Sequence, residues 1–193
     1  MDTTRQSTHV FQLTKIALCV ALLCVSSYIA IPLPFTSVVL TAQTLVINVV
    51  ALILTPVQSA CAVGLYILLG ICGLPVFAGG TAGIGRIIGP TGGFIVGFLV
   101  AAPVISAIKG ERVQWLRYCL VTIAVGIPII DFLGTAFMCW FQKMGIVEAV
   151  IAAVLPFLLG DVIKCIVASY LGFVLNKVLP RNNVMRGKVT ERS

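Results

Sequence analysis

Six long stretches of the chain are almost entirely apolar, and short polar or glycine- and proline-rich segments separate them. A helix needs roughly 17–25 apolar residues to cross a bilayer, and fewer where neighbouring protein covers part of it. The pattern predicts an all-α polytopic membrane protein with about six transmembrane helices, which form a single membrane domain over residues 1–193. The predicted spans are 14–31, 40–55, 57–72, 91–108, 117–141 and 156–179.

The composition supports a membrane protein over a soluble one. Hydrophobic residues make up 60% of the chain and charged residues only 10%, whereas soluble domains carry about 25% charged residues. Seven cysteines occur singly inside apolar runs, without the spacing of metal ligands, and His9 is the sole histidine. We therefore predict no metal site and no cofactor, and we interpret the cysteines as small buried hydrophobes.

The distribution of basic residues predicts the orientation. With a cytoplasmic N-terminus, the positive-inside rule is satisfied by ten basic residues on the cytoplasmic side against three on the outer side. The ten are Arg5, Lys15, Lys109, Arg112, Arg117, Lys177, Arg181, Arg186, Lys188 and Arg192, and the three are Arg86, Lys143 and Lys164. We predict a multi-pass protein of the cell inner (cytoplasmic) membrane, with polar cytoplasmic termini at 1–13 and 180–193. The net charge of +7 is then explained by basic residues that lie next to anionic lipid headgroups, and no nucleic acid partner is expected.

Two charged residues interrupt the last apolar run. A charge inside a membrane span costs about 2.5–3.5 kcal/mol on insertion scales, so such residues are candidates for function. Asp161 and Lys164 are three residues apart and therefore share one helix face. They lie roughly 7 Å and roughly 12 Å below the predicted outer start of the helix. We interpret the pair as holding a polar ligand, and the alternative is an ion pair that only stabilises helix packing.

A glycine-rich but apolar segment, residues 73–93, falls on the same predicted outer side. Irregular backbone at membrane depth persists only where it is buried in protein or lines a cavity. The segment has no GxxxxGK[ST] pattern and no strand–turn–helix context, which argues against nucleotide binding. It is typical of a lid or wall over a small ligand.

Several motifs together resemble the BioY family of biotin transporters, which are substrate-binding S components of energy-coupling-factor (ECF) importers. The most specific combination is GLPVFAGG at 73–80 with GPTGGF at 89–94. The resemblance extends to residues 31–38, 41–45, 65–70 and 155–164. It covers most of 14–100 and 150–175, while 101–150 carries little of it.

The resemblance implies a six-helix domain that captures biotin in an outward-facing pocket, with Asp161 and Lys164 at that pocket. A carboxylate can accept from the ureido N–H groups, and an ammonium can donate to the ureido oxygen or to biotin's carboxylate. The further ligand-binding candidates are Gln43, Tyr66, Gly79, Gly80, Thr81 and Arg86. Asp131, in the middle of the fifth span, either faces the cavity or lies nearer the interface.

The resemblance also implies partners. Ala17 and Ala21 have the small-xxx-small spacing that permits close helix approach, and they are expected to dock a transmembrane coupling protein. Because the chain carries no ATP-binding motif, energy would come from two ATPase subunits, or transport would be facilitated and slow.

Three other functions remain as alternatives. One is an S component for another small vitamin, and another is a structural subunit that binds no ligand. A membrane-embedded enzyme would need clustered carboxylates or a nucleophile with its base, and the six acidic residues are spread singly. We therefore expect a transporter subunit and not an enzyme.

Overall fold

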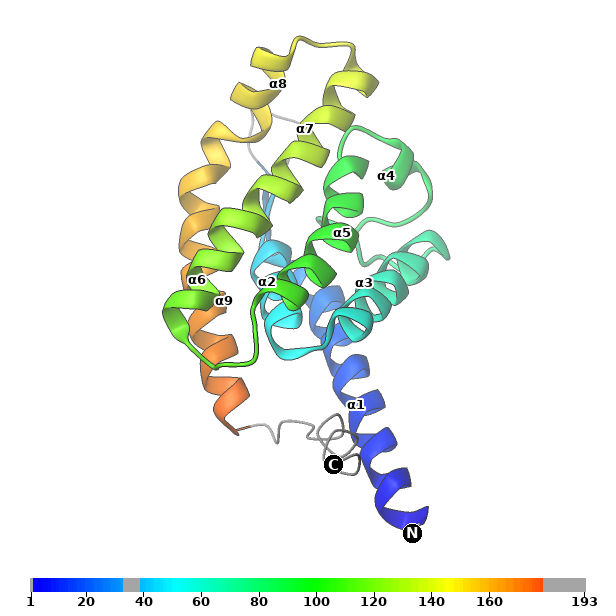
Figure 1. Ribbon diagram of the computed structural model, residues 1–193. Helices are drawn as coiled ribbons and strands as arrows, with labels where there is room; N and C mark the ends of the chain where they lie inside the picture. The colour runs from blue at the N-terminus through cyan, green and yellow to red at the C-terminus, as the bar shows by residue number, and fades with distance from the viewer. Residues whose placement is uncertain (1, 33–38, 179–193) are drawn as a thin grey trace, which may run out of the picture.

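The computed structural model describes residues 2–32 and 39–178 as a bundle of helices with one short two-stranded hairpin (Figure 1). The basic tail expected from residue 180 onward lies outside the described residues. Seven of the elements are the helices α1 Asp2–Ser26, α2 Gln43–Ile53, α3 Pro56–Ile71, α4 Gly85–Ile88, α5 Gly92–Ile108, α8 Ile146–Ala153 and α9 Leu155–Val178. The hairpin pairs β1 Ala30–Pro32 antiparallel with β2 Val39–Thr41.

One long helix, Trp115–Gln142, corresponds to the predicted fifth span. It consists of α6 Trp115–Val121, a π-helical turn η1 Thr122–Gly126, and α7 Ile127–Gln142. Pro128 lies in the first turn of α7, where its missing N–H removes one hydrogen bond of the α-helical ladder. The wider turn just before it accommodates this loss and keeps the helix continuous.

Two helices, Trp115–Gln142 and Leu155–Val178, are long and apolar enough to cross a membrane by themselves, and the other apolar helices are shorter. Residues 2–13, expected as a polar terminus, are helical and continue into α1. That helix ends at Ser26, before residue 31 where the first span was expected to end, because the chain turns there into strand β1. The segment 73–93 also contains a short helix, α4.

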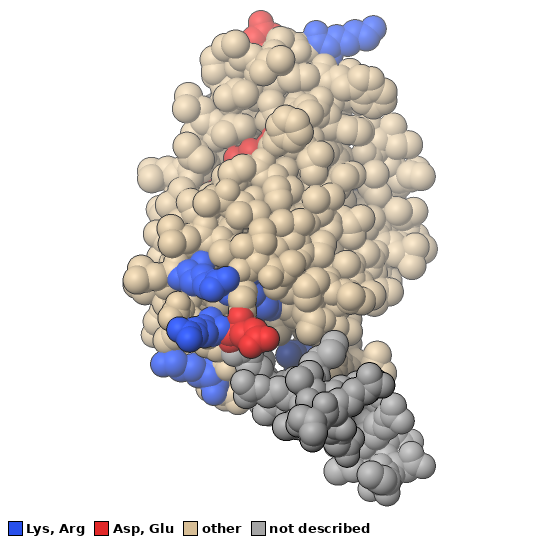
Figure 2. All heavy atoms as spheres, viewed as in Figure 1, with Lys and Arg blue, Asp and Glu red and all other residues tan. Residues whose placement is uncertain are grey.

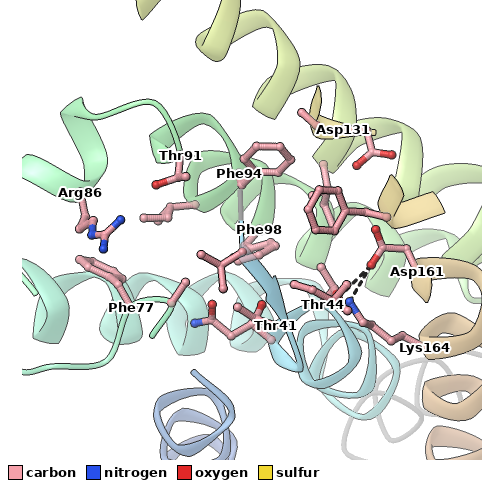
Figure 3. Close-up of a pocket in the computed structure, with 18 of the residues that line it drawn as sticks. Thr41, Thr44, Phe77, Arg86, Thr91, Phe94, Phe98, Asp131, Asp161 and Lys164 are labelled. Atoms are coloured by element: carbon pink, nitrogen blue, oxygen red, sulfur yellow. Dashed lines mark hydrogen bonds and ion pairs between the residues drawn. The ribbon is translucent and has the colours of Figure 1, made fainter. Parts of the chain in front are cut away.

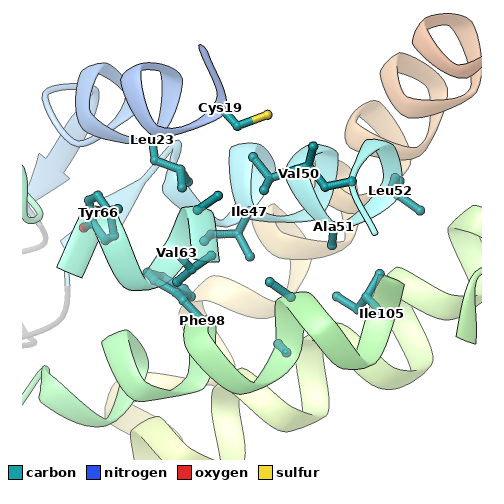
Figure 4. Packing of buried hydrophobic residues seen from close by; sticks show 14 of the residues in the cluster. Cys19, Leu23, Ile47, Val50, Ala51, Leu52, Val63, Tyr66, Phe98 and Ile105 are labelled. Carbon is teal, nitrogen blue, oxygen red and sulfur yellow. The ribbon is translucent and has the colours of Figure 1, made fainter. Parts of the chain in front are cut away.

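Helix α2 lies at the centre of the bundle and is buried almost all round. Ile47, Val50 and Leu52 are fully buried there and pack with Leu23 of α1 and Phe98 of α5 (Figure 4). A helix that is apolar on every side is typical of the interior of a bundle. Its eleven residues span only about 16 Å, so α2 cannot extend through the full thickness of a membrane.

Small residues permit the close approach of α5 to α7. A Cβ atom at Gly93 would lie 2.3 Å from the carbonyl oxygen of Leu133, and one at Gly97 would lie 3.1 Å from Cα of Ile130. Any larger side chain at Gly93 would therefore push the two helices apart. Close contact between these helices places the phenylalanines of α5 opposite α7 and α9.

The carbonyl groups at the carboxyl end of α2 receive hydrogen bonds from four side chains of other helices, here called the α2 carboxyl-end cluster: Lys15, Ser106, Lys109 and Asn176. Lys109 Nζ donates to the carbonyls of residues 51 and 52 at 2.9 and 2.8 Å, and also to that of residue 54. Lys15, Asn176 and Ser106 donate to residues 53, 52 and 54 at 3.3, 2.9 and 2.6 Å. The last carbonyls of a helix have no hydrogen-bond partner within the helix, and the side chains of this cluster supply the missing donors.

The two ends of the bundle differ in charge. The N-terminus of α1 and the end of α9 lie at one end, and α4 and α8 lie at the other (Figure 1). Most of the visible lysine and arginine side chains gather at the end where α9 finishes and α5 connects to α6 (Figure 2). We call these the basic end and the pocket end.

Candidate functional site

A pocket opens at the pocket end of the bundle, above the amino end of α2. It contains about 730 Å³ of empty space, part of which is open to the outside. Its walls come from the hairpin, α2, α3, the 73–93 segment, α5, α7, α8 and α9. The lining residues are mostly apolar, with charged groups at separate places, as is common in sites for small molecules.

Asp161 and Lys164 both line this pocket from the first turns of α9 (Figure 3). Lys164 Nζ lies 3.0 Å from Asp161 Oδ1, and the two side chains are 16% and 13% exposed. Thr44 Oγ1, from the amino end of α2, donates to the same carboxylate oxygen at 3.3 Å. The two predicted charges therefore form a mostly buried pair that lines the pocket.

Gln43 and Tyr66, also predicted from the sequence, form one wall. Gln43 Nε2 donates to the Tyr66 hydroxyl at 2.5 Å and to the Val76 carbonyl at 3.4 Å. The Tyr66 ring is 1% exposed and meets the Phe77 ring edge-on, with centroids 5.7 Å apart. These contacts connect α2, α3 and the glycine-rich segment, so they hold the wall in one position.

Thr81 and Arg86 line the pocket, but Gly79 and Gly80 do not appear among its lining residues. Both glycines have positive φ, 72° and 69°, in the turn between the paired residues Phe77 and Thr81. The Gly79 N–H donates to the carbonyl of Ser27 at 3.0 Å. The glycines therefore join the segment to the end of α1, and the side chains on either side of them reach the pocket.

Arg86 and the Asp161–Lys164 pair lie on opposite sides of the pocket (Figure 3). Arg86 comes from α4, near Phe77 and Thr91, while Asp131 of α7 lies on the side of Asp161. Of the two positions considered for Asp131, the structure therefore has the one that faces the cavity. The pocket presents one cation at one side and two carboxylates with one ammonium at the other.

Sequence reasoning missed much of the pocket wall. The missed group consists of small polar residues at the hairpin and helix starts, together with aromatic residues: Thr41, Thr44, Thr91, Phe77, Phe94, Phe98 and Phe157. Phe94 and Phe98 are four residues apart on one face of α5. That spacing is equally typical of an apolar packing stripe, so the sequence could not assign these residues to a pocket.

Ala17 and Ala21 lie away from the pocket. Both are exposed on α1, on the same side as Leu18, Leu22 and Val25, which are 60%, 54% and 63% exposed. Two alanines within a row of larger apolar side chains form a shallow depression on the helix surface, where another helix can approach closely.

The comparisons with known proteins agree with this geometry. A model of the BioY family matches residues 2–181. The chain belongs to the BioY family. It is 35% identical to Biotin transporter BioY2 of Lactococcus lactis subsp. cremoris, over 92% of this chain and 97% of that protein. It is also 35% identical to Biotin transporter BioY of Thermotoga maritima, over 86% of this chain and 96% of that protein.

The three-dimensional comparison gives the same result. The structure is similar to the S-component for biotin from an ECF-type ABC transporter, with a TM-score of 0.82 at 25% identity. The match covers 92% of this chain and 95% of that chain. The BioY family membership and the all-α membrane fold expected from the sequence are therefore confirmed.

Proposed function

We propose that this BioY-family chain captures biotin as the substrate-binding S component of an ECF-type importer and releases it on the opposite side of the membrane. The observation that carries the proposal is the Asp161–Lys164 pair, which lines a mainly apolar pocket. A protein stabilised only by burial would gain little from such a pair, because desolvation offsets the attraction between the charges.

The arrangement of the pocket matches the chemistry of biotin from end to end. The ureido group offers N–H donors and an oxygen acceptor, which suit the Asp161 carboxylate and the Lys164 ammonium. The phenylalanine side chains of α5 and α9 suit the fused rings and the aliphatic chain. Arg86, on the far side of the pocket (Figure 3), suits the carboxylate at the end of that chain.

The proposed orientation places the pocket end outside and both chain termini in the cytoplasm of a cell whose inner membrane the protein crosses. The gathering of lysine and arginine side chains at the basic end (Figure 2) supports it through the positive-inside rule. Lys109, Arg112 and Arg117 lie in or beside the α5–α6 connection at that end.

The proposed partners are a transmembrane coupling protein and two ATPase subunits. The exposed Ala17 and Ala21 on α1 support docking of the coupling protein at that helix, because small side chains permit close helix packing. Among the described residues, those that line the pocket include none from α1, so docking and ligand capture would use separate surfaces.

The test is equilibrium binding of radiolabelled biotin to purified protein, with unlabelled thiamine, riboflavin and other vitamins as competitors. We expect competition by biotin alone. In Asp161→Asn the Kd should rise about 100-fold, because a hydrogen bond to a charged group contributes about 1.5–3 kcal/mol. Glu148→Gln, at an exposed acid of α8, is the matched control and should leave the Kd unchanged. Equal affinity for biotin in all three proteins would reject the proposed site, and competition by another vitamin would reject biotin as the ligand.

A further inference from the structure

A second, smaller cavity lies next to the ligand pocket, between α2, α7 and α9. We call it the acidic subcavity, and it is lined by Thr44, Asn48, Ile127, Ile130, Asp131, Asp161 and Cys165. Four of these residues, Thr44, Ile130, Asp131 and Asp161, also line the ligand pocket. The subcavity has room for about one particle of the size of a water molecule.

Asn48 is the first sign that the subcavity has an occupant. This side chain is 2% exposed, and its Nδ2 donates to the Thr44 carbonyl at 2.8 Å and to Cys165 Sγ at 3.5 Å. Its Oδ1 has no hydrogen-bond partner among the described residues. A buried acceptor without a donor costs about 1–3 kcal/mol, so an occupant that offers positive charge or a donor would remove that cost.

The charge of the subcavity is the second sign. Among residues 2–32 and 39–178, the single salt bridge joins Asp161 to Lys164, which leaves the Asp131 carboxylate without a cationic partner. Two carboxylates and one ammonium meet here, because Arg86 lies on the far side of the ligand pocket (Figure 3). A buried carboxylate without a cationic partner is costly, and either a proton on the carboxylate or a cation beside it removes that cost.

The neighbouring backbone supports the same conclusion. The π-helical turn Thr122–Gly126 ends directly before Ile127, which lines the subcavity. A Cβ atom at Gly126 would lie 3.2 Å from Asn48 Oδ1, so glycine lets the helix approach this oxygen. π-helical turns are frequent at functional sites.

The occupant that fits these observations is a small monovalent cation. The subcavity is lined by two carboxylates and by the neutral oxygens of Thr44 and Asn48. A proton on Asp131 would remove the charge without filling the space beside Asn48 Oδ1. A water molecule would satisfy Asn48 and leave the charge, and a divalent ion would reverse the charge. We propose that the acidic subcavity binds a sodium ion through Asn48 Oδ1 and the carboxylates of Asp131 and Asp161.

The site has a functional consequence that rests on the proposed function. The two sites share Asp161, which lines both cavities and is the proposed partner of the ureido group of biotin. Sodium keeps the Asp161 carboxylate ionised for that group, so each ligand raises the affinity for the other by the same factor. Sodium binding itself does not depend on the identity of the vitamin.

The first test measures sodium binding without biotin. Thermal unfolding of the purified protein is followed as sodium chloride replaces choline chloride at constant ionic strength. A ligand that binds only the folded state raises the Tm in a saturable way, and we expect such a rise in wild type and in Glu148→Gln but not in Asp131→Asn. Binding of radioactive ²²Na⁺ to the same three proteins at low temperature gives the result without unfolding. No saturable effect, an equal effect of potassium, or an unaltered effect in Asp131→Asn would each overturn the proposal.

The second test measures coupling through the Kd of biotin in sodium and in choline. We expect about tenfold tighter binding in sodium, a typical coupling factor, and no sodium dependence in Asp131→Asn. Equal affinity in both salts would overturn the coupling. Failure of biotin to bind in either salt would instead reject the proposed function, while the ²²Na⁺ measurement still decides the sodium site.

Discussion

The two ends of helix α2 differ in how their hydrogen-bonding groups find partners. At the carboxyl end, Lys15, Lys109, Ser106 and Asn176 donate to the carbonyls of residues 51–54. At the amino end, Thr44 and its neighbours line a pocket that also contains Asp161, Lys164 and Arg86. The protein itself supplies the hydrogen-bond partners at one end, and we propose that a ligand supplies them at the other.

Two lysines illustrate the difference. Lys109 donates to three backbone carbonyls at the carboxyl end of α2. Among the described residues, Lys164 has a hydrogen bond to Asp161 at 3.0 Å. Both are charged groups in an apolar bundle, so burial alone does not identify a functional lysine. The difference is that Lys164 lines the pocket, where a ligand could accept from its remaining donors.

The largest effect is expected at Lys109. Lys109→Met removes three hydrogen bonds from a charged donor, each of which contributes about 1.5–3 kcal/mol. The carbonyls of residues 52 and 54 keep their donors Asn176 and Ser106. The free energy of unfolding, measured by denaturant titration in detergent, should fall by about 3 kcal/mol or more. Lys177→Met is the control: its ammonium lies 4.1 Å from the centre of the Phe173 ring, and an exposed contact of this kind contributes about 0.5–1 kcal/mol. Equal losses in the two variants would contradict the structural role of Lys109.

The next effect is expected at Lys164, and it concerns binding. Lys164→Met should raise the Kd for biotin by about 30- to 100-fold, since charged hydrogen bonds contribute about 1.5–3 kcal/mol. The free energy of unfolding should fall by less than in Lys109→Met, because the pair lines an open pocket where water can solvate Asp161 once Lys164 is removed. If the unfolding free energy fell as in Lys109→Met while the Kd stayed constant, the pair would be structural and the contrast between the two lysines would not hold.

The smallest effect is expected at Thr44, whose hydroxyl donates to Asp161 Oδ1 at 3.3 Å. Thr44→Val removes this single bond, so the Kd for biotin should rise about fivefold, which corresponds to about 1 kcal/mol. The matched control is Thr135→Val, because Thr135 Oγ1 is buried and has no partner among the described residues. That variant should keep its affinity and lose no stability. A larger change of the Kd in Thr135→Val than in Thr44→Val would argue against the geometry of the pocket.

Much of the fold was accessible from the residues alone. The apolar runs indicated most of the helices, and the motifs at 73–80 and 89–94 indicated the BioY family. Asp161 and Lys164 stood out because charges in apolar runs are rare and costly. These features are local, since each depends on residues within a few helical turns of one another.

The glycine-rich segment shows the limit of that reasoning. The segment does contribute to the wall of the pocket, through Phe77 and Thr81. Gly79 and Gly80 instead form the turn that contacts Ser27. Sequence alone cannot distinguish a glycine needed for positive φ from one needed for close contact with a ligand, because both uses depend on the missing Cβ.

The chain composition and its local patterns are sufficient to specify helices, membrane character and the presence of a charged pair. Which polar groups meet depended on the packing of helices distant in sequence: Thr44 and Asp161 are 117 residues apart, as are Asn48 and Cys165. Lys109 and Lys164 have the same chemistry, and only their neighbours in space make one structural and the other available to a ligand. The physical reason is that the free-energy cost of burying a polar group depends on the partners around it, and those partners come together only after the helices have packed.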